Sequence, residues 1–140
     1  MMQCSECGAQ LLHADDSCAR RFDVLLALDH SRREPWGSRH GQAFAAFALQ
    51  HPQAYARSLD AAWDLLYRIY CLGEPVSTAI AARRANPQAA PIAPRPAARL
   101  ADFTVTIADL GEFDGARYPA ALDEWCMSAL KAWGAPMASR

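Results

Sequence analysis

The chain has 140 residues, 52% of them hydrophobic, which is typical of one globular domain of ordinary size. Its 14 basic and 15 acidic side chains give a net charge of -1, which excludes a general attraction to nucleic acid or to an anionic membrane. No stretch is apolar over the roughly 20 residues that cross a bilayer, and the N-terminus lacks the pattern of a signal peptide. We therefore expect a cytoplasmic protein without membrane contact.

The N-terminal segment carries the most specific motif of the chain. Cys4, Cys7 and Gly8 form a C-x-x-C-G turn, in which two thiolates can face one metal ion while the glycine lets the backbone turn. A third thiol, Cys18, follows a short distance further along the chain. The chain has five cysteines, an odd number that fits a disulfide framework poorly. We therefore expect a zinc-binding turn over residues 1–16.

The rest of the chain has the hydrophobic period of helices, separated by proline and glycine breakers. Ser17, Ser38 and Ser77 are candidate N-caps, and Pro52 and Gly73 are candidate helix ends. The predicted helices cover residues 17–30, 38–51, 53 or 58 to 73, 77–85, a short segment from 106, and 118–133. Cys71 and Cys126 lie on apolar faces of two of these helices, where we expect them to be core residues.

Prolines and alanines between Asn86 and Pro96 exclude both helix and strand, and predict a linker or surface strap. Thr106 and Asp109 resemble a capping box, although one very short β segment near 103–107 is an alternative. The sequence thus predicts an all-α, compact helical bundle with an N-terminal zinc-binding turn. Its single domain, 1–140, is expected to comprise a zinc turn (1–16), a helical core (17–85), a Pro-rich linker (86–99) and C-terminal helices (100–134).

The fourth zinc ligand has to be sought among the histidines. His13 would complete C-x2-C-x5-H-x4-C, a local pattern close to a retroviral-type zinc knuckle. His40 and His51 share one face of a helix, but about 16 Å separates them along its axis, so they cannot bind one ion. A short turn joins helices 17–30 and 38–51, which should therefore pack antiparallel. That pairing places His51 beside Cys18 and His40 beside His30.

This geometry favours a site made of Cys4, Cys7, Cys18 and His51, with zinc as its metal. His13 and His40 remain alternatives for the fourth position. His51 could instead cap the C-terminal end of its helix, where a positive charge suits the helix dipole.

Several motifs of the chain occur together in one known family. They are Cys4-x-x-Cys7-Gly8, Cys18 with Phe22, His40 leading to Leu49-Gln50-His51-Pro52, the segment Thr106 to Asp109, and the helix Trp125 to Trp133. Together they resemble a bacterial family classed as a domain of unknown function. The resemblance implies the metal site and the fold, implies that Gln50 and His51 act together, and brings no established activity. The chain departs from it in having Phe47 or Ala48 where a tyrosine is expected, and no histidine after Trp133.

Two functions follow from these features. A closed site of four protein ligands would make the metal structural, in an accessory or protein-interaction module with a protein partner. If one position were open to water, the protein would be a metal-dependent enzyme with His40 as acid or base, beside Glu34 or Asp29. Nucleic-acid binding is a weaker third hypothesis, which depends on Arg20, Arg21, Arg32, Arg33 and Arg39. Neither the oligomeric state nor any catalytic residue follows from the sequence.

Overall fold

Helices make up most of the computed structural model, which describes residues 2–13 and 15–137. The α-helices of this part of the chain are α1 (Cys18–His30), α2 (His40–Gln50), α3 (Leu59–Leu66), α4 (Val76–Ala85) and α5 (Tyr118–Ala132). Single turns of 3₁₀ type form η1 (Gly37–Arg39), η2 (Ala56–Ser58) and η4 (Ile107–Leu110), and a π-helical turn forms η3 (Tyr67–Cys71). The predicted all-α fold is confirmed.

One small sheet accompanies the helices. Strands β1 (Met2–Gln3) and β2 (Gln10–Leu11) pair antiparallel, with Met2 opposite Leu11 and Gln3 opposite Gln10. Residues 1–16, which were predicted to be a turn and a loop, thus include a β-hairpin. Strands of two residues are too short to show an alternating pattern in the sequence.

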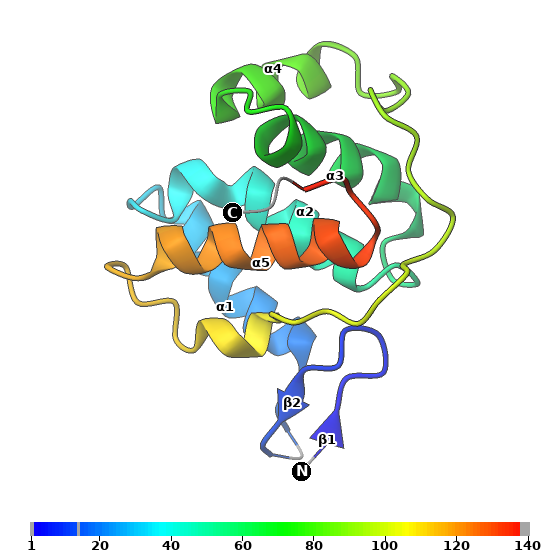
Figure 1. Cartoon of the computed structure of the whole chain (residues 1–140). Coiled ribbons are helices and arrows are strands. Elements are labelled where there is room, and N and C mark those ends of the chain that lie inside the picture. The colour runs from blue at the N-terminus through cyan, green and yellow to red at the C-terminus, as the bar shows by residue number, and fades with distance from the viewer. Residues whose placement is uncertain (1, 14, 138–140) are drawn as a thin grey trace.

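Helix α2 lies at the centre of the fold, against α3 and α5 (Figure 1). Its alanines allow these neighbours to approach closely, and large side chains of α5 fill the remaining space. Trp125 and Trp133 of α5 are both buried, and their indole N–H groups donate to Gln50 Oε1 (2.9 Å) and to the Leu49 carbonyl (2.8 Å). Helix α5 is therefore held to the last turn of α2 at its middle, through Trp125, and directly after its C-terminal end, through Trp133.

The helix boundaries agree closely with the prediction, whereas two of the predicted caps differ. Ser17 caps α1 by accepting a hydrogen bond from the Arg20 N–H (3.0 Å). Ser38 caps nothing, because the turn η1 precedes α2 and the Ser38 hydroxyl donates to Glu34 instead (2.8 Å). Ser77 lies inside α4, which begins one residue earlier.

The segment near 103–107 forms a helix start and not a β segment. The Thr106 N–H donates to Asp109 Oδ2 (2.8 Å), and the pair forms the predicted capping box of η4. Ser128 Oγ of α5 accepts hydrogen bonds from the N–H groups of Thr104 (3.0 Å) and Val105 (2.9 Å). These backbone donors are satisfied by a side chain, so no partner strand is needed.

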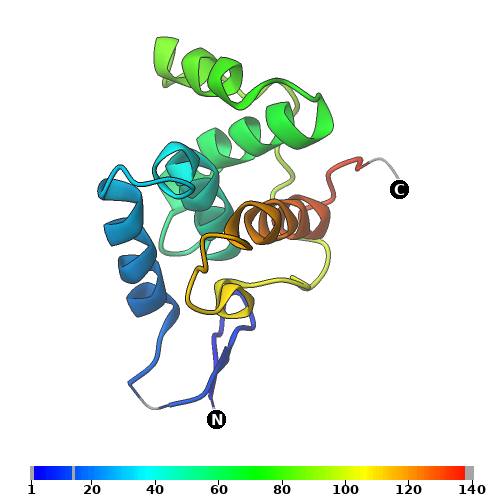
Figure 2. The ribbon, with the colours of Figure 1, turned by 90° about the vertical axis from the view of Figure 1, so that its left-hand side faces the viewer.

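The two ends of the molecule differ in character. The β-hairpin lies at one end, beside the start of α1, and α4 lies at the other, beyond α2 and α3 (Figures 1 and 2). The chain between α4 and η4 returns along the outside of the helices (Figure 1). Among the described residues, no helix combines the length and apolar character needed to cross a bilayer.

Candidate metal centre

The loop of the β-hairpin presents two of the predicted ligands. The Cys4 N–H donates to the Ala9 carbonyl (2.9 Å), and the Gly8 N–H donates to the Cys4 carbonyl (2.9 Å). Gly8 has a φ of 83°, a left-handed conformation that favours glycine. Its position after Cys7 therefore has a backbone reason, since this turn folds the loop so that Cys4 and Cys7 reach one site.

The other two predicted ligands come from helix ends. Cys18 is the first residue of α1, and His51 directly follows the last residue of α2. One atom from each of Cys4, Cys7, Cys18 and His51 lies within 4.8 Å of the others. Cys7, Cys18 and His51 are buried, while Cys4 is half-buried. Three separate segments thus converge on one small volume.

Two of the distances between these atoms are close to the edges of a metal-centred tetrahedron. Two thiolates bound to zinc lie about 3.8 Å apart, and a thiolate and an imidazole nitrogen about 3.5 Å apart, as bond lengths near 2.3 Å and 2.0 Å require. The distance between the sulfurs of Cys7 and Cys18 is 3.6 Å, and that between Cys4 Sγ and His51 Nε2 is 3.7 Å. An ion can therefore be accommodated without separating the elements.

The imidazole of His51 is held in one orientation. Its Nδ1 lies 2.8 Å from the Phe47 carbonyl, one turn earlier in α2, and its ring stacks on the Phe47 ring at 4.1 Å between centroids. Because a carbonyl can only accept, Nδ1 carries a hydrogen, and Nε2 is the ring nitrogen that faces the sulfurs. A metal-binding histidine is commonly oriented in this way by a second contact.

The contacts within the cluster favour a thiolate. The Cys18 thiol donates to the Cys7 sulfur, which outweighs burial and lowers the pKa of Cys7 to about 4, while the same contact raises the pKa of Cys18. Burial by itself lowers the pKa of His51, but the Cys7 sulfur and the Phe47 carbonyl outweigh it and raise that pKa to about 9. The cluster thus stabilises an ionised thiol, the form that binds metals.

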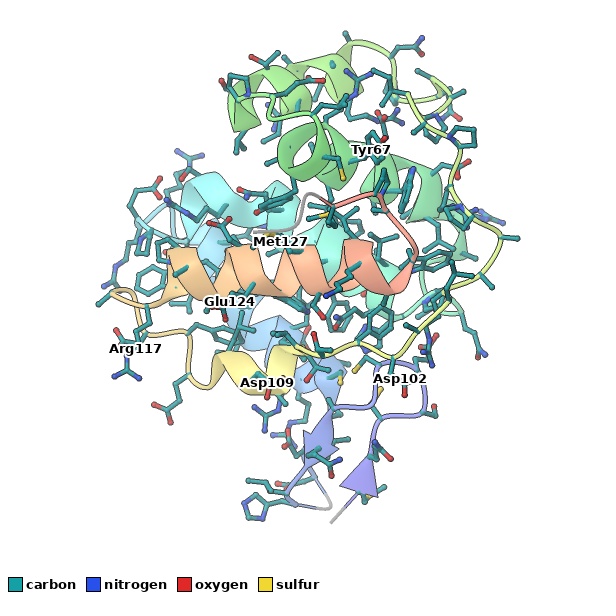
Figure 3. All side chains as sticks on the ribbon, in the orientation of Figure 1. Tyr67, Asp102, Asp109, Arg117, Glu124 and Met127 are labelled. Atoms are coloured by element: carbon teal, nitrogen blue, oxygen red, sulfur yellow. The ribbon has the colours of Figure 1, made fainter. Side chains whose placement is uncertain are left out.

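A polar contact outside the cluster also holds the hairpin loop in place. Glu6, between the two cysteines of the loop, accepts a hydrogen bond from the Gln53 N–H (2.8 Å), just after the Pro52 that ends α2. On its other side the loop faces residues 99–103, and Figure 3 shows Asp102 beside it. A polar cavity of about 420 Å³ lies between these segments.

The remaining histidines lie elsewhere. His13 is exposed and is not part of the cluster. His40 lies at the opposite end of α2, where its Nδ1 is 2.9 Å from Asp29 Oδ2 and its ring centroid 5.5 Å from that of His30. The predicted pairing of these two histidines is correct. His40 and the cysteine cluster lie at opposite ends of α2. His40 is therefore too far away to act as an acid or base on a molecule bound at the cluster.

Gln50 and the remaining cysteines have structural surroundings. Gln50 is fully buried and bridges two segments, since its Oε1 accepts from Trp125 (2.9 Å) and its Nε2 donates to the Val105 carbonyl (2.7 Å). Gln50 and His51 therefore contact different partners, although they are adjacent. Cys126 is buried and Cys71 is half-buried against the core, as predicted.

Sequence reasoning missed the roles of Phe47 and Glu6 at this site. Phe47 could have been found, because its carbonyl is one helical turn before His51. Glu6 gave no signal, because the partner of its carboxylate is a backbone N–H whose position depends on the docking of the whole hairpin.

The chain belongs to a family of unknown function (DUF5946), whose model matches residues 2–134. The resemblance predicted from the cysteine and Q-H-P motifs is thereby confirmed at the level of the family. No curated protein and no solved structure matches the chain significantly.

Proposed function

We propose that Cys4, Cys7, Cys18 and His51 bind one zinc ion that stabilises the fold. The observation that carries this proposal is the convergence of four metal-binding atoms, all within 4.8 Å of one another, from three separate segments. Three thiolates and one imidazole are soft ligands, and their tetrahedral arrangement is typical of structural zinc. Four protein ligands complete this coordination and leave no position for a substrate or an activated water.

The ion would act as a clasp between the hairpin, α1 and α2. The hairpin has two-residue strands and contributes few buried side chains of its own, so it needs an external contact to remain folded. Zinc would supply that contact, because its bonds to the four ligands would join the hairpin, α1 and α2 at one point. The protein would then serve as an accessory or protein-interaction module, and its exposed apolar side chains Ile92 and Leu100 are candidates for contact with a partner.

Metal analysis of single variants tests the ligand set. Cys18→Ser and His51→Ala should each lower the zinc content from about one ion per chain and reduce the free energy of unfolding, because a buried ligand is lost. His13→Ala is the matched control, since it removes an exposed histidine from the same part of the chain. Purified wild-type protein without a stoichiometric metal, or zinc loss in His13→Ala alone, would contradict the proposal.

The spectrum of cobalt-substituted protein tests whether the metal is structural. A closed tetrahedral site of three thiolates and one imidazole should give intense visible absorption that small anions such as cyanide leave unchanged. A spectrum that shifts when cyanide is added would show an exchangeable position and would favour a catalytic metal.

A further inference from the structure

A second candidate site lies at the end of the molecule opposite the cysteine cluster. A groove of about 1330 Å³ runs between α4 and the N-terminal halves of α2 and α5. Figures 1 and 2 both show α4 beyond α2, on the far side from the hairpin. Leu65, Val76 and Ile80 supply apolar surface along the groove. Apolar walls with a few polar groups are typical of a small-molecule site, and this groove is larger than the roughly 300–1,000 Å³ of most such sites.

One polar group of the groove is an oriented histidine. His40 lines the groove, and its Nδ1 is 2.9 Å from Oδ2 of Asp29. The Asp29 side chain is 0% exposed, whereas that of His40 is 41% exposed. The buried carboxylate therefore fixes the imidazole and leaves Nε2 on the accessible side. The His40–Asp29 pair is separate from the cysteine cluster, so the metal centre does not account for it.

A second polar group is a buried amide whose orientation is determined. Gln42 is 5% exposed and lines the groove. The Tyr70 hydroxyl donates its single hydrogen to Asp123 (2.6 Å), so it must accept from Gln42 Nε2 (2.7 Å). The side-chain hydrogen bond of Gln42 within residues 2–13 and 15–137 uses Nε2, which leaves the acceptor Oε1 unused. It is available to a ligand.

The charges around the groove are mainly positive. Three arginines line it, and Asp123 is the one acidic residue among its lining residues. Arg83 is already paired with the buried Asp64 (3.0 Å), and Arg39 lies 3.6 Å from Glu34. Arg84 forms no ion pair within the described part of the chain. Its guanidinium is the group best placed to bind an external anion.

We propose that this groove binds a small organic anion with an apolar body. The apolar body lies against Leu65, Val76 and Ile80, and Arg84 pairs with the anionic group. His40 and Gln42 provide polar contacts that select the orientation. The site is independent of the metal centre, because its residues come from the opposite end of α2.

Titration with anilinonaphthalene sulfonate tests the proposal, since this probe has an aromatic body, one sulfonate and one N–H donor. Wild-type protein should bind it saturably at one site per chain, with enhanced fluorescence. Arg84→Gln should weaken binding about fivefold through loss of a partly exposed charge-assisted hydrogen bond. Ser77→Trp, on the exposed side of α4, should block the groove. Arg57→Gln, an exposed arginine of η2 outside the groove, should bind like the wild type.

Competition identifies the anionic group, because displacement of the probe by hexanoate indicates a carboxylate ligand and displacement by phenyl phosphate a phosphate ester. Displacement by neither compound would overturn the proposal, as would absence of saturable binding or equal affinity in wild type, Arg84→Gln and Ser77→Trp. A dimer in sedimentation that Ser77→Trp dissociates would also overturn it, by showing a second copy of the chain in the groove. Far-UV circular dichroism and zinc content, measured on the same samples, should be unchanged and separate this result from a failure of the metal site.

Discussion

At the scale of single residues, buried polar side chains connect the helices of this fold through hydrogen bonds. Gln50 uses both ends of its amide, one on the Trp125 indole of α5 and one on the Val105 carbonyl. An apolar residue of the same size could fill the volume but could satisfy neither partner. A buried polar group without a hydrogen-bond partner lowers the stability of the fold by more than a typical hydrogen bond raises it.

Replacing Gln50 by leucine should therefore destabilise the protein without releasing its metal. The variant leaves the Trp125 N–H without a partner, and it leaves the Val105 carbonyl with only the longer hydrogen bond from the Ser128 hydroxyl (3.4 Å). This predicts a loss of about 2–4 kcal/mol in the free energy of unfolding by urea. Gln53→Leu is the control, because the Gln53 side chain is exposed. Zinc loss in Gln50→Leu at an unchanged free energy of unfolding would instead place Gln50 at the metal site.

Asp29 predicts a pH dependence of stability. Burial raises the pKa of Asp29 above its ordinary value of 3.8, although the hydrogen bond from His40 opposes this. The folded protein thus holds this proton more tightly than the unfolded chain, so the carboxyl contributes stability below its ordinary pKa. That contribution is lost as the pH rises through the raised value.

This contribution is measured by urea unfolding of the wild type and Asp29→Asn between pH 4 and neutrality. The free energy of unfolding of the variant should gain on that of the wild type as the pH rises, since asparagine does not ionise. Asp23→Asn, on the exposed face of the same helix, should show no such trend. A pH-independent difference between wild type and Asp29→Asn would contradict the burial argument.

At the scale of elements, a single carboxylate connects α3, α4 and the Pro-rich segment. The Asp64 side chain is 0% exposed and accepts from Arg68 Nε (3.0 Å), Arg83 Nη1 (3.0 Å) and the Ile92 N–H (2.8 Å). The Trp63 indole also donates to the Ala93 carbonyl (2.9 Å). The Pro-rich segment is therefore fastened along α3, as a surface strap would be.

Asp64→Asn should loosen both α4 and this segment. The variant removes the partner of two arginines in a buried network, for which losses of about 3–5 kcal/mol are typical. Trypsin should then cleave more rapidly after Arg83 and Arg99, which limited proteolysis with mass spectrometry detects. Asp60→Asn removes an exposed partner of Arg95, so it should cost less than about 1 kcal/mol. Equal protection of the two variants would show that Asp64 does not hold the segment.

The helices were predictable because each depends on local signals. Ser17 caps α1, Gly73 ends the turn after α3 with a positive φ, and the Thr106–Asp109 pair starts η4. The hairpin was not predictable, because its two-residue strands depend on the closure of the loop around Gly8. The π-helical turn η3 has no sequence signal that separates it from a continuation of α3.

At the scale of the whole molecule, the cysteine cluster joins the hairpin to the helices and the groove lies at the other end. The convergence of Cys18 and His51 could be predicted because one antiparallel helix pair relates these residues by simple helix geometry. The groove could not, since its walls come from four helices whose separation is decided by packing. The sequence marked His40 as a candidate ligand, acid or base, whereas it gave no signal for Gln42.

Removal of the metal should therefore act unevenly along the chain. Chelation of zinc under reducing conditions should increase amide hydrogen exchange in residues 2–13, at the start of α1 and at the end of α2, because these segments share the ion. The Trp125 region of α5 should keep its protection longest, since it is buried in the helical core. Uniform loss of protection over the whole chain would mean that the clasp and the core unfold together.

The central claim is that Cys4, Cys7, Cys18 and His51 hold one zinc ion, and zinc K-edge X-ray absorption of the purified protein tests it most directly. The predicted coordination shell has three sulfurs at about 2.3 Å and one imidazole nitrogen at about 2.0 Å. In His51→Ala the imidazole scattering should disappear. A shell with fewer than three sulfurs, or imidazole scattering that survives in His51→Ala, would contradict the assignment.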